Sequence, residues 1–166
     1  MTAKYAASDF RRDMTGPCVY AAIADFGGAD KFVKVGYTIK LVTRMSELQT
    51  GCPVQIGDVA YARVPTVEAA RHVEKLVHQA MKPYRSQGEW FRFDLSQPED
   101  ERVWRGAIPA VLNHVVGKGR WNMRSINYGE VRAALAEANS ERYQRRLRRL
   151  RAKWPGANGA SGKITA

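Results

Sequence analysis

The chain has 166 residues, 45% of them hydrophobic and 26% charged, which is the composition of a folded protein large enough to bury a core. Lys and Arg number 27 against 16 Asp and Glu, giving a net charge of +11. Such an excess of positive charge favours a polyanionic partner such as nucleic acid, the alternative being a ribosome-like or merely soluble basic protein. No apolar run approaches the length of a membrane span, which argues against a membrane protein.

The cysteines and histidines argue against a zinc site. The two cysteines, Cys18 and Cys52, form no CxxC pair, and the three histidines are scattered along the chain. The N-terminal residues contain no apolar segment of the secretory type. We therefore expect a cytoplasmic protein whose thiols are reduced.

The first part of the chain predicts a hairpin followed by a helix. After a polar arm over 1–16, the apolar run 18–24 and the alternating run 31–36 flank a glycine-containing turn, which indicates an antiparallel hairpin. Thr38 is the expected N-cap of a helix over 39–49, in which apolar residues recur at helical spacing.

The middle of the chain predicts further strands that alternate with helices. Residues 55–64 predict a third strand, and a Pro-Thr pair then opens an amphipathic helix over 67–82. The aromatic segment 89–94 is expected to be a short strand or extended chain. Residues 98–116 predict another helix.

The composition changes after this helix. Residues 117–121 form a basic, glycine-containing linker, and Asn127 followed by Glu130 is typical of a capped helix start. The helix is expected to continue to residue 154, and the small, polar tail over 155–166 is expected to be disordered.

These segments together predict an α+β fold. We expect a small antiparallel sheet of about three strands, flanked by helices, with a basic helical C-terminal extension. The expected divisions are the arm over 1–16, a domain over 17–116, the extension over 117–154 and the tail over 155–166.

An ordered set of motifs lies within residues 17–94. Cys-Val-Tyr ends at Tyr20, Lys-Val-Gly begins at Lys34, an arginine follows ten residues later at Arg44, and Leu-Gln-Thr-Gly-Cys-Pro, Glu74 and Gly-Glu-Trp-Phe come next. In this order and spacing the set resembles the GIY-YIG endonuclease superfamily. It is most similar to the short phage-type branch that has a lysine in its second motif and ends in Gly-Glu-Trp-Phe.

The resemblance implies a role for each of four residues. Glu74 would hold one divalent ion, Mg²⁺ or Mn²⁺, since such ions are commonly bound by one or two carboxylates together with water and phosphate. Arg44 would clamp the scissile phosphate with two donors. Tyr20 would act as a base or position the attacking water, and Lys34 on the adjacent strand could favour its phenolate by supplying a nearby positive charge.

Each of the four also has an ordinary structural interpretation when it is taken singly. The tyrosine would pack across strands, the lysine and arginine would be solvated, and the glutamate would pair with a neighbouring arginine or histidine. Trp90, Phe91 and Phe93 could stack on bases, but packing of the sheet against the helices is the favoured interpretation. The ordered set, rather than any single residue, favours the nuclease hypothesis.

Two positions depart from the family pattern. Leu48 stands where many members have a His or Tyr one turn after the arginine, and the asparagine that usually follows the metal-binding glutamate is missing. Arg85, Gln87 and Glu89 remain open as its replacement. These departures bear on catalysis more than on fold.

The C-terminal extension contains a dense cluster of positive charge on one predicted helix. Like charges at this density repel each other in water and are stabilised by phosphates, which predicts a helix that grips nucleic acid. The alternatives are a solvated surface helix, or a basic amphipathic helix on an acidic partner or a membrane surface. The cluster consists of Arg142, Arg145, Arg146, Arg148, Arg149, Arg151 and Lys153.

The sequence thus predicts a GIY-YIG-type endonuclease that hydrolyses DNA phosphodiester bonds with a divalent metal ion and has no membrane partner. One alternative is a non-catalytic DNA-binding module on the same fold, and another is a basic component of a larger nucleoprotein assembly. The sequence does not distinguish DNA from RNA, and it does not determine the oligomeric state.

Overall fold

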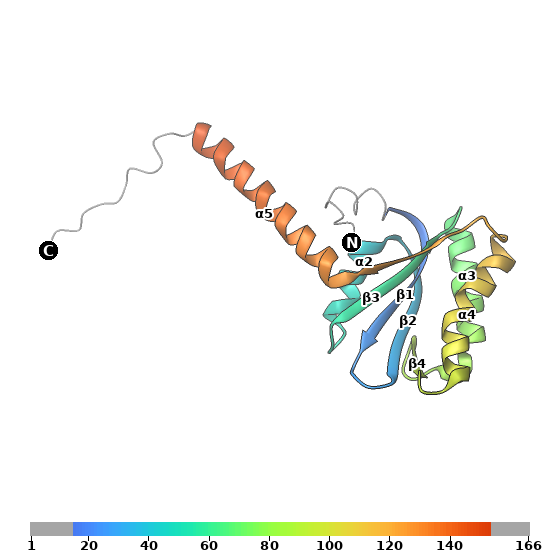
Figure 1. Cartoon of the computed structure of the whole chain (residues 1–166). Coiled ribbons are helices and arrows are strands. Elements are labelled where there is room, and N and C mark those ends of the chain that lie inside the picture. Colours follow the sequence, from blue (N-terminus) through green and yellow to red (C-terminus); the bar gives the residue numbers. More distant parts are fainter. Residues whose placement is uncertain (1–14, 154–166) are drawn as a thin grey trace.

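The computed structural model describes residues 15–153 (Figure 1). Most of the predicted arm over 1–16 and the whole predicted tail over 155–166 lie outside the described residues. Within the described range the chain forms an antiparallel sheet with helices on both faces (Figure 1). The elements in chain order are β1 Thr15–Asp25, β2 Asp30–Lys40, α2 Leu41–Thr50, β3 Ile56–Arg63, α3 Val67–Ala80, the 3-10 turn η1 Lys82–Tyr84, β4 Trp90–Asp94, α4 Pro98–Val115, β5 Met123–Asn127 and α5 Tyr128–Lys153.

The sheet has five strands in the order β4-β2-β1-β3-β5, and every neighbouring pair is antiparallel. The predicted α+β class is confirmed, but the expectation of about three strands is wrong. The unexpected strand is β5, which pairs with β3 from Asp58↔Asn127 to Ala62↔Met123. It follows the predicted linker and precedes α5, so the C-terminal helix starts from the sheet.

Alternation along β1 divides the protein between two hydrophobic cores, because successive side chains of a strand point to opposite faces. Val19 and Ala21 face the core that α3 and α4 close, and these two helices lie side by side over one face of the sheet (Figure 1). Tyr20 and Ala22 face a smaller core that α2 and the first turn of α5 close. The strand therefore presents Tyr20 beside α2.

A local sequence signal explains the start of α3 but not that of α2. The side chain of Thr66 accepts a hydrogen bond from the Ala69 amide (3.1 Å) at the start of α3, as predicted. Thr38 is not the N-cap of α2: it lies within β2, opposite Cys18, and its hydroxyl accepts from the Lys40 amide (3.0 Å). The hairpin extends further than its apolar alternation indicated, and α2 begins only at Leu41.

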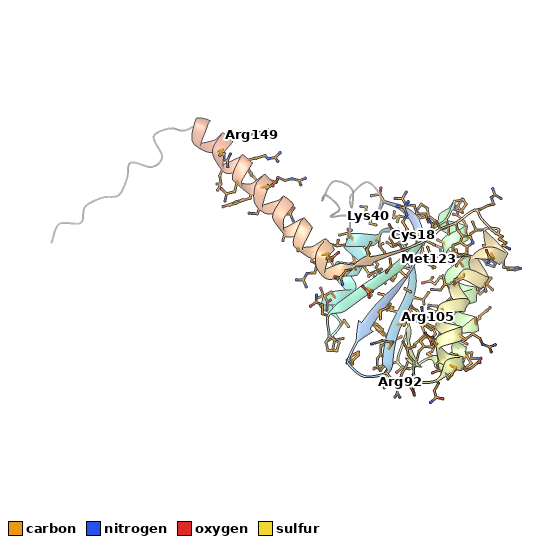
Figure 2. All side chains as sticks on the ribbon, in the orientation of Figure 1. Cys18, Lys40, Arg92, Arg105, Met123 and Arg149 are labelled. Carbon is orange, nitrogen blue, oxygen red and sulfur yellow. The ribbon has the colours of Figure 1, made fainter. Side chains whose placement is uncertain are left out.

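Among the described residues, helix α5 packs on the rest of the protein through its first turn. Asn127 accepts a hydrogen bond from the Glu130 amide (3.2 Å), which is the predicted N-terminal cap. Tyr128 and Val131 are buried in the smaller core, and the rest of the helix extends away from the sheet (Figure 1). Figure 2 shows Arg149 near the far end of this helix, well away from Cys18 in the sheet. None of the helices within residues 15–153 is long and apolar enough to cross a membrane.

Candidate functional site

An open cleft of about 540 Å³ lies at the edge of the sheet, beyond the last residue pair between β2 and β4. Strand β4 pairs with β2 only from Asp30 to Lys34, so the second half of β2 has an uncovered edge. Side chains from both faces of the sheet can meet at such an edge. The cleft is lined by Tyr20, Gly36, Tyr37, Thr38, Ile39, Arg44, Val67, Glu74 and Glu89.

Tyr20 contributes a phenol that is almost fully enclosed, with 1% of the residue exposed. Its ring lies over Gly36, the residue paired with it on β2. A Cβ atom added to Gly36 would lie 2.4 Å from the Tyr20 hydroxyl oxygen and 2.7 Å from Cζ, closer than non-bonded atoms can approach. The glycine of the Lys-Val-Gly motif is therefore required for the tyrosine to occupy this position.

Arg44 is the cation beside Tyr20. Its Nε donates a hydrogen bond to the phenolic oxygen (3.2 Å), and its Nη1 donates to Glu47 one turn later (3.1 Å). Burial raises the pKa of Tyr20, and the neighbouring Arg44 only partly opposes that effect. The hydroxyl is consequently protonated at neutral pH, and the guanidinium holds it in place.

Glu74 reaches the cleft from α3, which packs on the face of the sheet opposite to the one that carries Tyr20. Its carboxylate is half-buried and accepts a hydrogen bond from the backbone amide of Tyr37 on the uncovered edge. Burial raises the pKa of Glu74, Glu89 adds to this effect, and His78 and Arg44 oppose it. Among residues 15–153 no cation forms an ion pair with Glu74 within 4.0 Å.

His78 lies one turn after Glu74 and completes the same edge. Its Nε2 is 3.0 Å from the carbonyl oxygen of Val35, and its ring packs edge-to-face on Phe91 at 5.2 Å. Backbone groups that a longer β4 would have paired are thus bonded by side chains of α3. This arrangement fixes α3, and with it Glu74, against the sheet.

Lys34 forms an ion pair with Glu89. Its Nζ lies 2.9 Å from the Glu89 Oε2, and this pairing lowers the pKa of the Glu89 carboxyl. Glu89 lines the cleft, which distinguishes it from the other two open candidates: Gln87 lines a neighbouring hollow, and Arg85 lies over the Phe91 ring at 5.8 Å. The charge next to the phenol is that of Arg44.

The structure therefore brings Tyr20, Arg44 and Glu74 together around one cleft, with Lys34 at its border through Glu89. Sequence reasoning did not identify Gly36 or the Lys34–Glu89 pair as parts of this site. It also missed Arg71, which donates to the Tyr37 hydroxyl (3.1 Å) and stacks on that ring at the rim. Gly36, Lys34 and Glu89 all lie in the motifs that the sequence shows, but the motifs do not reveal the packing of Gly36 under Tyr20 or the pairing of Lys34 with Glu89, and Arg71 had no sequence signal.

The carboxylates of the cleft suit a hard divalent cation. Within the described part of the chain no group of three or more His, Cys, Asp or Glu side chains could hold a metal ion. Mg²⁺, however, commonly takes one or two protein carboxylates and fills its other positions with water and substrate phosphate. Glu74 and Glu89 both line the cleft and could supply two such oxygen ligands; Glu89 is paired with Lys34, whereas Glu74 has no ion-pair partner among the described cations.

The predicted nucleic-acid-binding residues are separate from this cleft because they lie on α5 (Figure 2). The described side chains among them are exposed, and Arg145 forms an ion pair with Glu141 at 3.3 Å. The side chains of Arg151 and Lys153 lie outside the described residues. The exposed members are Arg142, Arg145, Arg146, Arg148 and Arg149.

A tyrosine hydroxyl, an arginine and a carboxylate around one cleft, at the edge of an antiparallel sheet in an α+β fold, indicate a nuclease-related class of domain. Residues 17–108 match the model of the T5orf172 domain, which covers more than half of the 166 residues. The chain belongs to this family, a phage-associated domain structurally related to the GIY-YIG and HNH-like nucleases. No curated protein and no solved structure is significantly similar to the chain.

Proposed function

We propose that the protein is a divalent-metal-dependent endonuclease that hydrolyses DNA phosphodiester bonds in the cleft at the edge of β2. The observation that carries the proposal is the meeting of the Tyr20 hydroxyl, the Arg44 guanidinium and the half-buried Glu74 carboxylate on one open surface. Phosphodiester hydrolysis needs a positioned water, a positive clamp on the phosphate and a stabilised leaving oxygen. The cleft offers a group for each requirement.

Tyr20 and Arg44 act as a unit in this proposal. The phenol accepts a hydrogen bond from the Nε of Arg44, so its own proton is free to be donated toward the cleft. At neutral pH Tyr20 orients the attacking water, and it takes up a proton only in its minor phenolate form. The remaining guanidinium donors of Arg44 bind the scissile phosphate.

Glu74 is the proposed metal ligand, with Glu89 as the second carboxylate on the same cleft. A bound Mg²⁺ or Mn²⁺ would neutralise charge that develops on the phosphate and stabilise the leaving oxygen. Lys34 holds Glu89 at 2.9 Å and keeps it ionised, so it acts on the site through this carboxylate. In this proposal Glu89 takes the place of the family asparagine.

Helix α5 supplies the grip on DNA. Its exposed arginines belong to the part of α5 that projects from the sheet (Figure 1), and Figure 2 shows Arg149 near the far end, so they can bind phosphates along the duplex while the cleft binds the phosphodiester that is cut. The match to the T5orf172 domain supports a nuclease-type module that acts on DNA, which is the substrate proposed for both the cleft and α5.

The test is nicking of supercoiled plasmid with Mg²⁺ or Mn²⁺, comparing the wild type with Glu74→Gln. We expect Glu74→Gln to reduce nicking by at least about 100-fold, the scale on which removal of a key electrostatic group lowers kcat. Gel-shift binding in EDTA should be unchanged. Glu101→Gln is the matched control, because Glu101 pairs with Arg105 on the far helix α4, and it should nick like the wild type.

The same experiment separates the main alternative, a non-catalytic DNA-binding module. Equal and low nicking by wild type and Glu74→Gln, together with tight, salt-sensitive binding, would overturn the nuclease proposal. The departures at Leu48 and at the family asparagine are the observations that favour this alternative.

A further inference from the structure

A second hollow, of about 580 Å³, lies on the other side of the Lys34–Glu89 pair. It is bounded by the tip of the β1–β2 hairpin, the loop that follows α2 and the loop that precedes β4. Glu89 lines both this hollow and the cleft, so the two are adjacent. The lining residues are Ala24, Phe26, Phe32, Lys34, Gly51, Cys52, Pro53, Ser86, Gln87, Gly88, Glu89 and Trp90. We call this hollow the aromatic groove.

Three aromatic rings define the groove. Phe26 is 52% exposed although it is one of the larger apolar side chains, and it meets Phe32 edge-to-face at 4.9 Å. Trp90 is half-buried, and the Nζ of Lys34 lies 6.0 Å from the centre of its ring. Phe91 and Phe93, by contrast, are fully buried and pack the core. Trp90 is thus the one ring of Trp90, Phe91 and Phe93 that faces the groove.

We propose that the aromatic groove binds an unpaired base of the DNA strand next to the phosphodiester in the cleft. The inference rests on the proposed function, and it extends that function to the state of the DNA. A ring that keeps half of its surface in water gains free energy when a flat partner covers it, and a nucleobase has such a face. Within a duplex both faces of each base are covered by its stacked neighbours, so an internal base must leave the stack, and with it its pair, to bind here.

The chemistry of the walls fits a nucleotide. The volume lies within the range of about 300–1,000 Å³ that is usual for small-molecule sites. The Lys34–Glu89 ion pair lies between the groove and the cleft, where the strand would cross, and the Nζ of Lys34 is 6.0 Å from the centre of the Trp90 ring. Ser86 and Gln87 add polar side chains that can bond to base edges without requiring one particular base. Preference for unpaired DNA, rather than for a sequence, is expected.

The protein contains its own reporter for this site. Cys52 lines the groove and is half-buried, so a thiol reagent can reach it. Cys18 is 3% exposed and serves as an internal reference that should not react in the folded protein.

The experiment measures alkylation of Cys52 by N-ethylmaleimide in EDTA, so that no cleavage takes place. A single-stranded oligothymidylate should protect Cys52, and a duplex of the same length should not. In parallel, Phe26→Ala should lower the affinity for the single strand by roughly 5- to 100-fold, which is the effect of losing one base–aromatic stack. Its affinity for the duplex should be unchanged, and Phe26→Tyr should restore single-strand binding.

Tyr143→Ala is the matched control. Tyr143 is 60% exposed on α5, so its removal deletes a comparable surface ring outside the groove. It should change single-strand and duplex binding by the same factor. Equal protection of Cys52 by both DNA forms, or equal losses for both forms in Phe26→Ala, would overturn the proposal.

The outcome is independent of whether the protein cuts DNA. If wild type and Glu74→Gln show equal and low nicking but the single strand still protects Cys52, the nuclease proposal fails and the base site stands. If Glu74→Gln abolishes nicking but Cys52 is protected by neither form of DNA, the nuclease stands and the base site fails.

Discussion

Gly36 is the residue on which the position of Tyr20 depends. Replacing it with alanine would place a methyl group 2.4 Å from the tyrosine hydroxyl oxygen, so the ring must move and its bond to Arg44 must break. We expect Gly36→Ala to cost about 1–3 kcal/mol of folding free energy, as overpacking usually does, and to reduce plasmid nicking at least about 10-fold.

A matched control is available in the same sheet. Gly57 on β3 has nothing within 4 Å of an added Cβ, so Gly57→Ala should leave nicking at the wild-type rate. Urea unfolding measures the loss of folding free energy, and the nicking assay on folded protein measures the loss of activity. Full nicking by a folded Gly36→Ala protein would show that the reaction does not depend on where Tyr20 lies.

Single residues of the cleft were predictable to different degrees. The motif order gave Tyr20, Arg44 and Glu74, and the structure brings these three together. Glu89 could not be chosen over Gln87 or Arg85, because all three lie on one loop and only the turn of that loop determines which side chain enters the cleft. The pairing of Lys34 with Glu89 depends on the same turn.

At the scale of elements, the side chain of Gln49 connects α2 to the start of β3. Its Oε1 accepts from the Ile56 amide (2.8 Å), and its Nε2 donates to the carbonyl oxygen of Val54 (2.9 Å). Gln49→Leu leaves both partly buried backbone groups without this partner, and we expect a loss of about 1–3 kcal/mol in the free energy of unfolding. Urea denaturation measures this loss.

The neighbouring residue provides the comparison. The Thr50 hydroxyl donates to the Ser46 carbonyl on the exposed side of the same helix, so Thr50→Ala should stay within about 0.5 kcal/mol of the wild type. Equal stabilities for the two variants would mean that the loop after α2 is held by other contacts.

The segments that the sequence did not predict are strands whose extended state depends on hydrogen bonds to a neighbouring strand far away in the sequence. Strand β5, Met-Arg-Ser-Ile-Asn, has no fully buried residue and no clear apolar alternation, so its extended state depends on its hydrogen bonds to β3. The far end of β2 is similar, because Thr38 resembles a helix cap locally but is paired with β1. The long helices were predictable because their periodicity and caps are local.

At the scale of the whole molecule, positive charge is concentrated on a helix that projects from the sheet. If α5 grips phosphates, replacing four of its exposed arginines with glutamine should weaken DNA binding, and the slope of log K against log salt should fall in magnitude by about 3 to 4. Helicity should be retained, since Arg and Gln have similar helix propensities. The four positions are Arg142, Arg146, Arg148 and Arg149.

Arginines elsewhere test whether position or only total charge matters. Arg102 and Arg105 on α4 are paired with Glu99 and Glu101, so changing both to glutamine should leave the salt slope unaltered. Equal changes for the two sets, measured by fluorescence anisotropy over a salt series, would rule out a specific grip by α5.

The direct continuation of β5 into α5 has a geometric consequence. A helix of 26 residues is about 39 Å long, and each residue inserted near its base turns everything beyond it by about 100° and advances it by about 1.5 Å. One inserted residue would therefore point the arginines away from their former direction, whereas seven, nearly two full turns, would restore that direction about 10.5 Å further out. The number of residues between β5 and the arginines therefore sets the direction in which these arginines point relative to the sheet.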